Sequence, residues 1–510
     1  MVMTIGNRRF GGEAGTDLAT ASVVQPHSTP LEPASHDQWI PLVWSAGLVS
    51  VGVAYLLGWG PVVEHRSQWT TSGDLWGIFR AAHYVGWGFV GGIYGPSTGV
   101  NTFPGMSVLL APVAQVSSGL GLSESSPTVL LFHPAAALLL QPIELLLACT
   151  VLFAANSVAV VIGVGKLSRF WLIGTLAVVA WPVAALWGHA EDVLAVTFGL
   201  MAIRLLLGGK SRNSGWLMGF AIVFQPLAGF LLPIGIAASV AGRRMRFVAQ
   251  ALLPSVALIG FALAGNWSGT FGALTKEPGL PALNHGTPWL SLAPRIGTLS
   301  IAKVPGRFRI GQLPGHVQPI VGSAPKALVL VSAGPVRTIG LLLAVLIGLF
   351  VWRMRPDAIA ILWLCGAALA LRCYFESVMT PYYLAPPLIV ALIAAARMGR
   401  LRFVVAATCG LFCTVFSYWD YSPWVWWLPV VGMLTAVLAC GYPGRKHLTA
   451  NWIAEGGIRG DEAEGSPSAS AEAQESKPAP ISAAQPYLGK PLGGISELTP
   501  GSRHCGHDSD

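Results

Sequence analysis

Long apolar stretches separated by short polar loops dominate the chain between about residue 40 and residue 441. A transmembrane helix needs about 20 mostly apolar residues, because the hydrocarbon core of a bilayer is about 30 Å thick. The stretches that meet or approach this length are 40–60, 105–122, 141–164, 170–188, 190–208, 247–265, 334–352, 357–372, 381–397, 402–417 and 422–441. The pattern therefore predicts an all-α protein, a polytopic transmembrane helix bundle with about 11–13 membrane segments.

Basic residues in the short loops predict the orientation of these segments, because Lys and Arg are enriched on the cytoplasmic side. The residues concerned are Lys166, Arg169, Lys210, Arg212, Arg243, Arg244, Arg246, Arg353, Arg355, Arg397, Arg400, Arg402, Arg445 and Lys446. If all are cytoplasmic, the segments from residue 170 onward alternate without conflict. Before residue 170, the segments cannot alternate in direction if 40–60, 105–122 and 141–164 all cross the membrane. Either 105–122 does not span, or 128–140 is an extra short crossing.

The stretch 213–242 is expected to begin and end on the cytoplasmic side, because basic residues flank both of its ends. Gln225-Pro226 lies near its middle. We therefore expect a pair of short helices or a re-entrant hairpin at this point. Such broken backbone is tolerated at membrane depth only where it is buried in protein or lines a cavity.

The two ends of the chain are polar and are expected to be disordered cytoplasmic tails, covering 1–39 and 448–510. Residues 1–39 lack the apolar run of a cleavable export signal, so the first apolar stretch is expected to be a retained helix. The transmembrane bundle, 40–441, then carries two outer loops, 61–104 and 266–333. The expected location is the plasma membrane.

The composition agrees with this fold class and narrows the partners. Of 510 residues, 53% are hydrophobic and 11% are charged, whereas about a quarter are charged in soluble proteins. The net charge of +8 is concentrated in short loops, which indicates contact with membrane lipid and not with nucleic acid. The seven cysteines lack metal-type spacing, and no P-loop, dinucleotide fingerprint or Gly-x-Ser-x-Gly motif occurs. No cofactor or metal is expected.

Acidic residues near the outer boundary are the first candidates for chemistry, because a charge at a helix centre costs about 2.5–3.5 kcal/mol on insertion scales. Asp74 begins an amphipathic stretch, 75–94, that is typical of an interfacial helix, and it is expected at or near the N-cap. Glu191 and Asp192 begin an apolar helix just after His189. These acids either complement the helix dipole only or form a functional cluster with the histidine.

Arg372 and Glu376 are four residues apart near the end of another apolar stretch. Their spacing places them on one helix face, where they either form an internal ion pair or leave the arginine to bind a substrate phosphate. Glu144, near the outer end of 141–164, is a weaker candidate for the same outer site.

The long outer loop contributes further candidates for substrate binding. Asn284 and His285 interrupt it with hydrogen-bonding side chains. Arg295, Arg307 and Arg309 follow, and they either steer a lipid phosphate or contact headgroups.

Two sequence motifs and their order resemble a known family. An apolar helix is followed by a long outer loop with an acid, then by Tyr94-Gly-Pro-Ser-Thr-Gly-Val-Asn-Thr-Phe-Pro-Gly-Met-Ser-Val-Leu-Leu-Ala-Pro112, and later by Gly188-His-Ala-Glu-Asp192. Over about residues 40–441 this resembles the GT-C class of integral-membrane glycosyltransferases. The likeness is greatest to actinobacterial polyprenyl-phosphate-mannose-dependent α-mannosyltransferases.

The resemblance implies a hexosyltransferase that moves a sugar, expected to be mannose, from a polyprenyl-phosphate donor to an extracytoplasmic glycan or glycolipid acceptor. It implies that Asp74 is the catalytic base, and that Glu191 and Asp192 act with it from a second cluster that includes His189. Arg372, together with Arg295, Arg307 or Arg309, would offset the charge of the leaving phosphate, which removes the need for a metal.

Two other classes of function remain open from the residues. A transporter or flippase for lipid-linked or small substrates is favoured by the broken helix expected in 213–242, since such breaks form midplane substrate sites. A non-catalytic envelope membrane protein that binds lipid-linked sugar is the other alternative.

Overall fold

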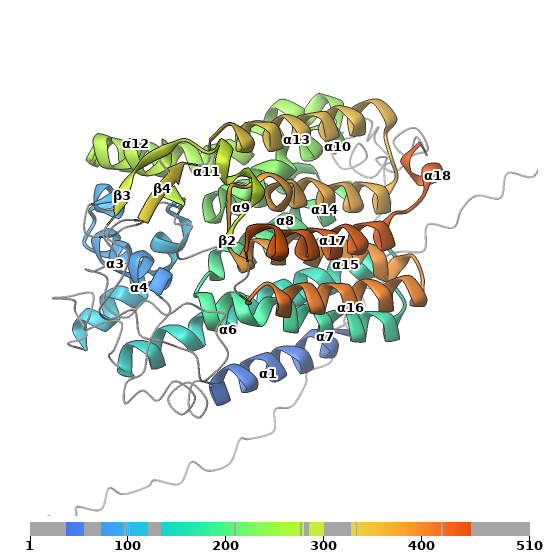
Figure 1. Cartoon of the computed structure of the whole chain (residues 1–510), viewed down its shortest axis with the longest axis horizontal. Coiled ribbons are helices and arrows are strands. Elements are labelled where there is room, and N and C mark those ends of the chain that lie inside the picture. Colours follow the sequence, from blue (N-terminus) through green and yellow to red (C-terminus); the bar gives the residue numbers. More distant parts are fainter. Residues whose placement is uncertain are drawn as a thin grey trace, which may run out of the picture. The chain divides into compact units, whose positions relative to one another are not determined.

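The structure of the chain is a computed structural model (Figure 1). The described residues are 37–55, 73–95, 98, 100, 102–120, 134–208, 211–275, 278–279, 285–299, 328–332, 334–419 and 422–449. All of them belong to one compact unit, Met1–Asp461. The expected tails therefore fall almost entirely outside the described residues.

The described residues are mainly helical, which confirms an all-α protein. Six helical segments have the length and composition to cross a membrane: Leu138–Val161, Lys166–Trp187, Ala241–Gly265, Arg337–Met354, Ala358–Phe375 and Pro423–Gly441. The helices that form them are α6 (Pro134–Val161), α7 (Lys166–Pro182), α11 (Arg244–Gly265), α13 (Gly334–Met354), α14 (Ala358–Phe375) and α17 (Pro423–Gly441). The second segment also includes the turn η4 (Val183–Trp187) after α7, and the third includes the 3-10 helix η6 (Ala241–Arg243) before α11. These are the properties of a multi-pass membrane protein.

Shorter helices complete the bundle. They are α1 (Trp39–Ala54), α8 (Ala190–Leu207), α9 (Ser211–Phe224), α10 (Leu232–Ala238), α15 (Ala385–Arg397) and α16 (Arg400–Phe416). Helix α15 is central, with its residues from Ala385 to Ala396 buried among α6, α7, α8, α14, α16 and α17. It is apolar on every side, as expected of a helix enclosed by protein.

Basic side chains from distant loops gather at one end of the bundle, here called the basic end. Three contacts join these loops: Arg397 lies beside Gly163, Arg402 donates to the Tyr442 carbonyl, and Arg244 lies over the Trp352 ring. Asp37, just before α1, joins the start of that helix to this end through ion pairs with Lys166 and Arg169. The grouping agrees with the orientation expected from the loop charges.

Helices α1 and α6 run antiparallel, and this resolves the alternation upstream of residue 170. Gly52 packs against Leu145, while the Cys149 thiol lies 3.8 Å from the Ser45 carbonyl oxygen. Since α1 starts at the basic end, the chain between these two helices leaves from and returns to the opposite end. A single crossing by the helix within 105–122 is therefore excluded.

The alternative of an extra crossing over 128–140 is wrong. Pro134 starts α6, which continues without a break to Val161. Proline is favoured in the first turn of a helix, where its missing N–H needs no partner. Residues 134–140 thus extend the next span and do not form a separate one.

The helix pair expected around Gln225-Pro226 is present. Helix α9 ends at Phe224, and the chain continues through the 3-10 helix η5 (Pro226–Leu231) into α10. Gln225 is extended, with φ −148° and ψ 119°, because a residue that precedes proline is disfavoured in the helical region. Phe247 packs against both Gly215, near the start of α9, and Gly235, near the end of α10. The start of α9 and the end of α10 therefore lie at the same level of the bundle.

The end opposite the basic end, here called the site end, carries the described elements of the two loops that were predicted to lie outside (Figure 1). From the first loop these are α3 (Gly73–Gly86), the 3-10 helix η3 (Val90–Tyr94) and α4 (Gly105–Gly119). The helix expected in 75–94 thus exists, but it is divided near Trp87. Helix α4 packs on α3, where the Ser107 hydroxyl donates to the Ile78 carbonyl.

The second outer loop contains a helix and short strands where only loop was expected. Helix α12 (Trp267–Thr275) precedes two antiparallel sheets, ordered β1-β4-β3 and β2-β5. The strands are β1 (Pro278–Gly279), β2 (His285–Gly286), β3 (Arg295–Leu299), β4 (Leu328–Ser332) and β5 (Val378–Met379). Strand β5 belongs to the α14–α15 connection, so the loop is anchored to a distant segment.

Gly91 and Gly265 allow η3 and α11 to touch through their backbones. A Cβ on Gly91 would lie 2.6 Å from the carbonyl carbon of Gly265. Gly91→Ala is therefore expected to lower the free energy of unfolding by about 1–3 kcal/mol through overpacking. The thermal midpoint in detergent measures this loss. Gly272→Ala is the matched control, because nothing lies within 4 Å of its added methyl group, and an equal loss there would contradict the prediction.

His83 joins α3 to α4 through a 3.0 Å contact between its Nδ1 and the Ser118 hydroxyl. Burial lowers the pKa of His83 from the ordinary value of 6.5. The unfolded chain therefore takes up the proton first, so the stability that neutral His83 contributes is complete above pH 6.5 and declines as the pH falls through its lower folded pKa. We expect the unfolding midpoint to fall between neutral and mildly acidic pH, and to fall less in His83→Gln. Identical pH profiles would refute this role.

Candidate functional site

The candidate site begins where α7 is interrupted at the site end. After Pro182 the helix widens into one π turn, η4 (Val183–Trp187), and such turns occur frequently at functional sites. Gly188 then takes a left-handed conformation, with φ 68° and ψ 36°, which glycine adopts without steric cost. The His189 amide donates back to the Val183 carbonyl at 3.0 Å. This geometry holds His189 immediately before the first turn of α8.

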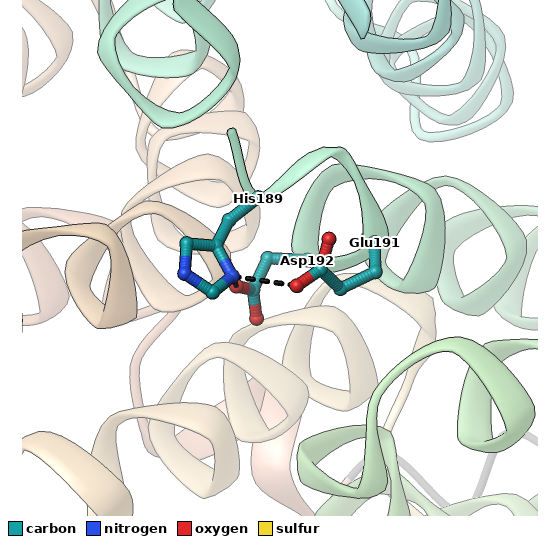
Figure 2. Close-up of side chains that lie close together, drawn as sticks. All are labelled: His189, Glu191 and Asp192. Atoms are coloured by element: carbon teal, nitrogen blue, oxygen red, sulfur yellow. Dashed lines mark hydrogen bonds and ion pairs between the residues drawn. The ribbon is translucent and has the colours of Figure 1, made fainter. Parts of the chain in front are cut away.

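His189, Glu191 and Asp192 turn their polar atoms toward one another, as Figure 2 shows. The Nδ1 atom of His189 lies 2.5 Å from Oε1 of Glu191 and 3.8 Å from Oδ2 of Asp192. One ligand-type atom from each residue lies within 4.8 Å of the others, a spacing that could hold a metal ion. The structure therefore brings together the three residues that the sequence placed in one turn.

Burial makes this cluster costly unless its charges are compensated. His189 is 5% exposed, Glu191 0% and Asp192 1%. Burying a carboxylate costs several kcal/mol, which is recovered only through close partners. Yet Oε2 of Glu191 and Oδ2 of Asp192 accept no hydrogen bond within the described part of the chain. A dipole-capping role alone does not explain acids that are so deeply buried.

Gln225, at the break between α9 and η5, reaches the cluster from a separate element. Its Nε2 donates to Oδ1 of Asp192 at 2.8 Å. The same two residues line a small pocket whose other walls are mainly apolar: Ala195, Val196, Leu227, Ala228, Leu231, Leu369 and Pro386. The broken helix pair thus positions a side chain that orients one acid of the cluster.

Glu144 of α6 is a third acid beside the cluster. Thr150 of α6 and Thr197 of α8 hydrogen-bond at 3.0 Å. Glu144 and Glu191 each lie six residues before these threonines, so they are at a similar height on the two helices, which run in the same direction. Glu144 interacts electrostatically with both Glu191 and His189. It is 1% exposed, and neither of its oxygens accepts a hydrogen bond among the described residues.

Two histidines, each stacked on an aromatic ring, lie beside the connection between α14 and α15. His189 stacks on Tyr382 with ring centroids 3.8 Å apart, and His285 stacks on Trp426 at 4.0 Å. His285 also pairs with Met379 in the β2-β5 ladder, three residues before Tyr382. The connection therefore links the outer-loop histidine to the acidic cluster.

Arg372 and Glu376 form the ion pair expected from their spacing. The Arg372 Nε donates to Oε2 of Glu376 at 3.1 Å, and its guanidinium lies 3.4 Å from the centroid of the Tyr383 ring. Arg337 of α13 joins the same carboxylate at 3.1 Å. Arg372 also interacts electrostatically with Asp192, which connects this pair to the cluster.

The remaining predicted residues are placed only in part. Asp74 lies in the first turn of α3, one residue after its start, and its side chain is outside the described residues. Helix α3 contacts η4, the π turn that leads to His189. Arg295 lies in β3 with its side chain not described, and Asn284, Arg307 and Arg309 lie outside the described residues.

Gln225, Tyr382 and Arg337 were not among the residues predicted for the site. Gln225 is a polar residue inside an apolar stretch, and Arg337 is a basic residue at the end of a helix where the loop charges predict the outer side. Both signals are visible in the sequence. Tyr382 gives no comparable signal, since tyrosine is enriched at membrane interfaces in general.

Gly188→Ala is expected to strain the turn that presents His189, because a side chain in the left-handed region costs about 1–2 kcal/mol. The free energy of unfolding in detergent should fall by about this amount. Gly260→Ala in α11 is the control, since it meets nothing within 4 Å and alanine is favoured in helices. Equal stability of Gly188→Ala and the unaltered protein would show that the left-handed turn is not required.

Comparison of the chain with protein-family models, with curated proteins and with solved structures found no match.

Proposed function

We propose that this protein is an integral-membrane glycosyltransferase that uses a polyprenyl-phosphate sugar as donor. The observation that carries the proposal is the buried cluster of His189, Glu191 and Asp192 at the end of the bundle opposite the basic loops. Buried ionisable residues at a membrane boundary indicate a functional site by default. The resemblance of the Tyr94–Pro112 and Gly188–Asp192 stretches to GT-C enzymes supplies the class of reaction.

In the proposed reaction, Asp74 removes the proton from an acceptor hydroxyl as that oxygen bonds to the anomeric carbon. The bond between this carbon and the phosphate oxygen breaks, and its electron pair leaves with the polyprenyl phosphate. The sugar is inverted, because nucleophile and leaving group occupy opposite faces. Glu191 and Asp192 orient sugar hydroxyls, and Arg372 offsets charge on the leaving phosphate.

Sugar transfer is tested with the full chain in proteoliposomes that contain polyprenyl-phosphate mannose carrying a radiolabel. We expect label to move into glycolipid extracted from the host membrane, and to stop moving in Asp192→Asn. Mass spectrometry of envelope glycans from a deletion strain then identifies the natural acceptor. Absence of transfer together with an unchanged glycan profile would overturn the proposal.

A transporter is the second candidate, and the broken pair α9–η5 supports it. Unwound backbone beside polar side chains is typical of transporter substrate sites, and here Gln225 binds the buried acid Asp192 at such a break. Substrate flux across the same vesicles without product formation would favour this reading over transfer.

A further inference from the structure

We propose that His189, Glu191 and Asp192 bind a divalent cation, with Glu144 as a further carboxylate beside it. Each of the three offers one ligand atom, and these atoms lie within 4.8 Å of one another. The inference concerns the cluster itself and does not depend on the reaction proposed above.

The donor geometry needs little adjustment to accept an ion. Ligand atoms about 2.0–2.1 Å from a tetrahedral zinc ion are about 3.3 Å apart. The His189 Nδ1 atom is 3.8 Å from Oδ2 of Asp192, already near that spacing, and 2.5 Å from Oε1 of Glu191. Small rotations of the glutamate side chain would open the shorter separation to the same range.

The balance of charge favours a cation at this place. Glu144, Glu191 and Asp192 are all at most 1% exposed. The cationic groups that act on Asp192 are His189 and Arg372, and Arg372 also donates to Glu376. Three buried carboxylates therefore share little positive charge, and a divalent ion would compensate two of them directly.

Carboxylate oxygens that accept no hydrogen bond also favour a bound cation. Both oxygens of Glu144, Oε2 of Glu191 and Oδ2 of Asp192 are buried and accept no hydrogen bond within the described residues. Glu144 comes from a different helix, so its carboxylate is independent evidence for a ligand at the cluster. Buried polar atoms without partners are rare in native proteins, and a bound ion is one way in which they are satisfied.

Neighbouring residues hold the ligands as they do in metal sites. Gln225 donates to the Oδ1 atom of Asp192, leaving Oδ2 for the ion, and the Tyr382 ring fixes the plane of His189. Such supporting contacts orient metal ligands and tune their affinity. One imidazole nitrogen with carboxylate oxygens suits Zn²⁺ or Mn²⁺ better than Mg²⁺ or Ca²⁺, which prefer oxygen ligands alone.

The test measures metal content of the full chain in lipid nanodiscs. Protein stripped with a chelator is incubated with Zn²⁺ or Mn²⁺, desalted and analysed by mass spectrometry for bound metal. We expect about one ion per chain, as for a single site, and at least about tenfold weaker retention in Glu191→Gln and Asp192→Asn. Asp357→Asn is the matched control, because it removes the carboxylate of another histidine pair, with His447, at the basic end.

Thermal unfolding of the unaltered protein, stripped and reloaded, provides a second readout that needs no variant. We expect Zn²⁺ or Mn²⁺ to raise its unfolding midpoint and to leave that of a folded Asp192→Asn protein unchanged. If the unaltered protein retains neither ion and its midpoint does not move, the proposal fails. Equal retention by Asp192→Asn, Glu191→Gln and Asp357→Asn would also overturn it.

Discussion

Replacing Asp74 by Asn is expected to abolish sugar transfer while the protein still inserts and folds. Asparagine has the shape of aspartate but accepts no proton at working pH, and general-base catalysis contributes about 10²–10⁴-fold to a rate. Asp74 lies in the first turn of α3, the helix that contacts η4 before His189. The measurement is the initial rate of label transfer in proteoliposomes with saturating donor.

Asp37→Asn is the control for loss of one carboxylate, because Asp37 pairs with Lys166 and Arg169 at the basic end. Its transfer rate should match that of the unaltered chain. Size-exclusion profiles and helicity of both variants show whether the bundle is intact. Full transfer activity in a folded Asp74→Asn protein would remove this residue from the mechanism.

Glu376→Ala is expected to give the largest loss of stability, about 3–5 kcal/mol, because it leaves buried cationic charge without its carboxylate. The Arg372 side chain is 8% exposed and that of Glu376 6%, so water cannot replace the lost partner. The free energy of unfolding, measured by denaturant titration in mixed micelles, reports the effect. Arg372→Met combined with Glu376→Ala should recover part of the loss, since both charges are then absent.

Arg337→Met is the matched comparison on the same carboxylate. The Arg337 side chain is 31% exposed, and partly solvated ion pairs contribute about 0–1 kcal/mol. Its effect should therefore be several times smaller than that of Glu376→Ala. Similar losses in the two variants would mean that burial does not govern this network.

The helical bundle and its polarity are predictable from the sequence because both depend on local properties of the chain. The apolar stretches became helices near the expected positions, and the basic loops of Lys166, Arg397 and Arg402 meet at one end. The break at Gln225-Pro226 was also predicted, because proline restricts the residue before it wherever it occurs. The role of 105–122 was left open, since hydropathy cannot distinguish a short span from a helix packed on α3.

The candidate site was predicted only where its members are neighbours in sequence. His189, Glu191 and Asp192 share one turn, and Arg372 with Glu376 share one helix face, so spacing alone brings them together. The partners from other elements, such as Gln225, Tyr382 and Arg337, were not predicted. Whether Asp74 joins them remains a prediction, since its side chain is not described.

The sequence by itself therefore determined the class of fold, the grouping of basic loops at one end of the bundle and the broken helix pair. It also determined the part of the candidate site formed by His189, Glu191 and Asp192. Only the tertiary structure decided that Gln225 meets Asp192, that His285 stacks on Trp426 and that buried Glu144 of α6 interacts with Glu191 of α8. The physical reason is that hydropathy and helix periodicity are set along the chain. Contacts between helices depend on their rotation and relative height, which are fixed by packing among many residues at once.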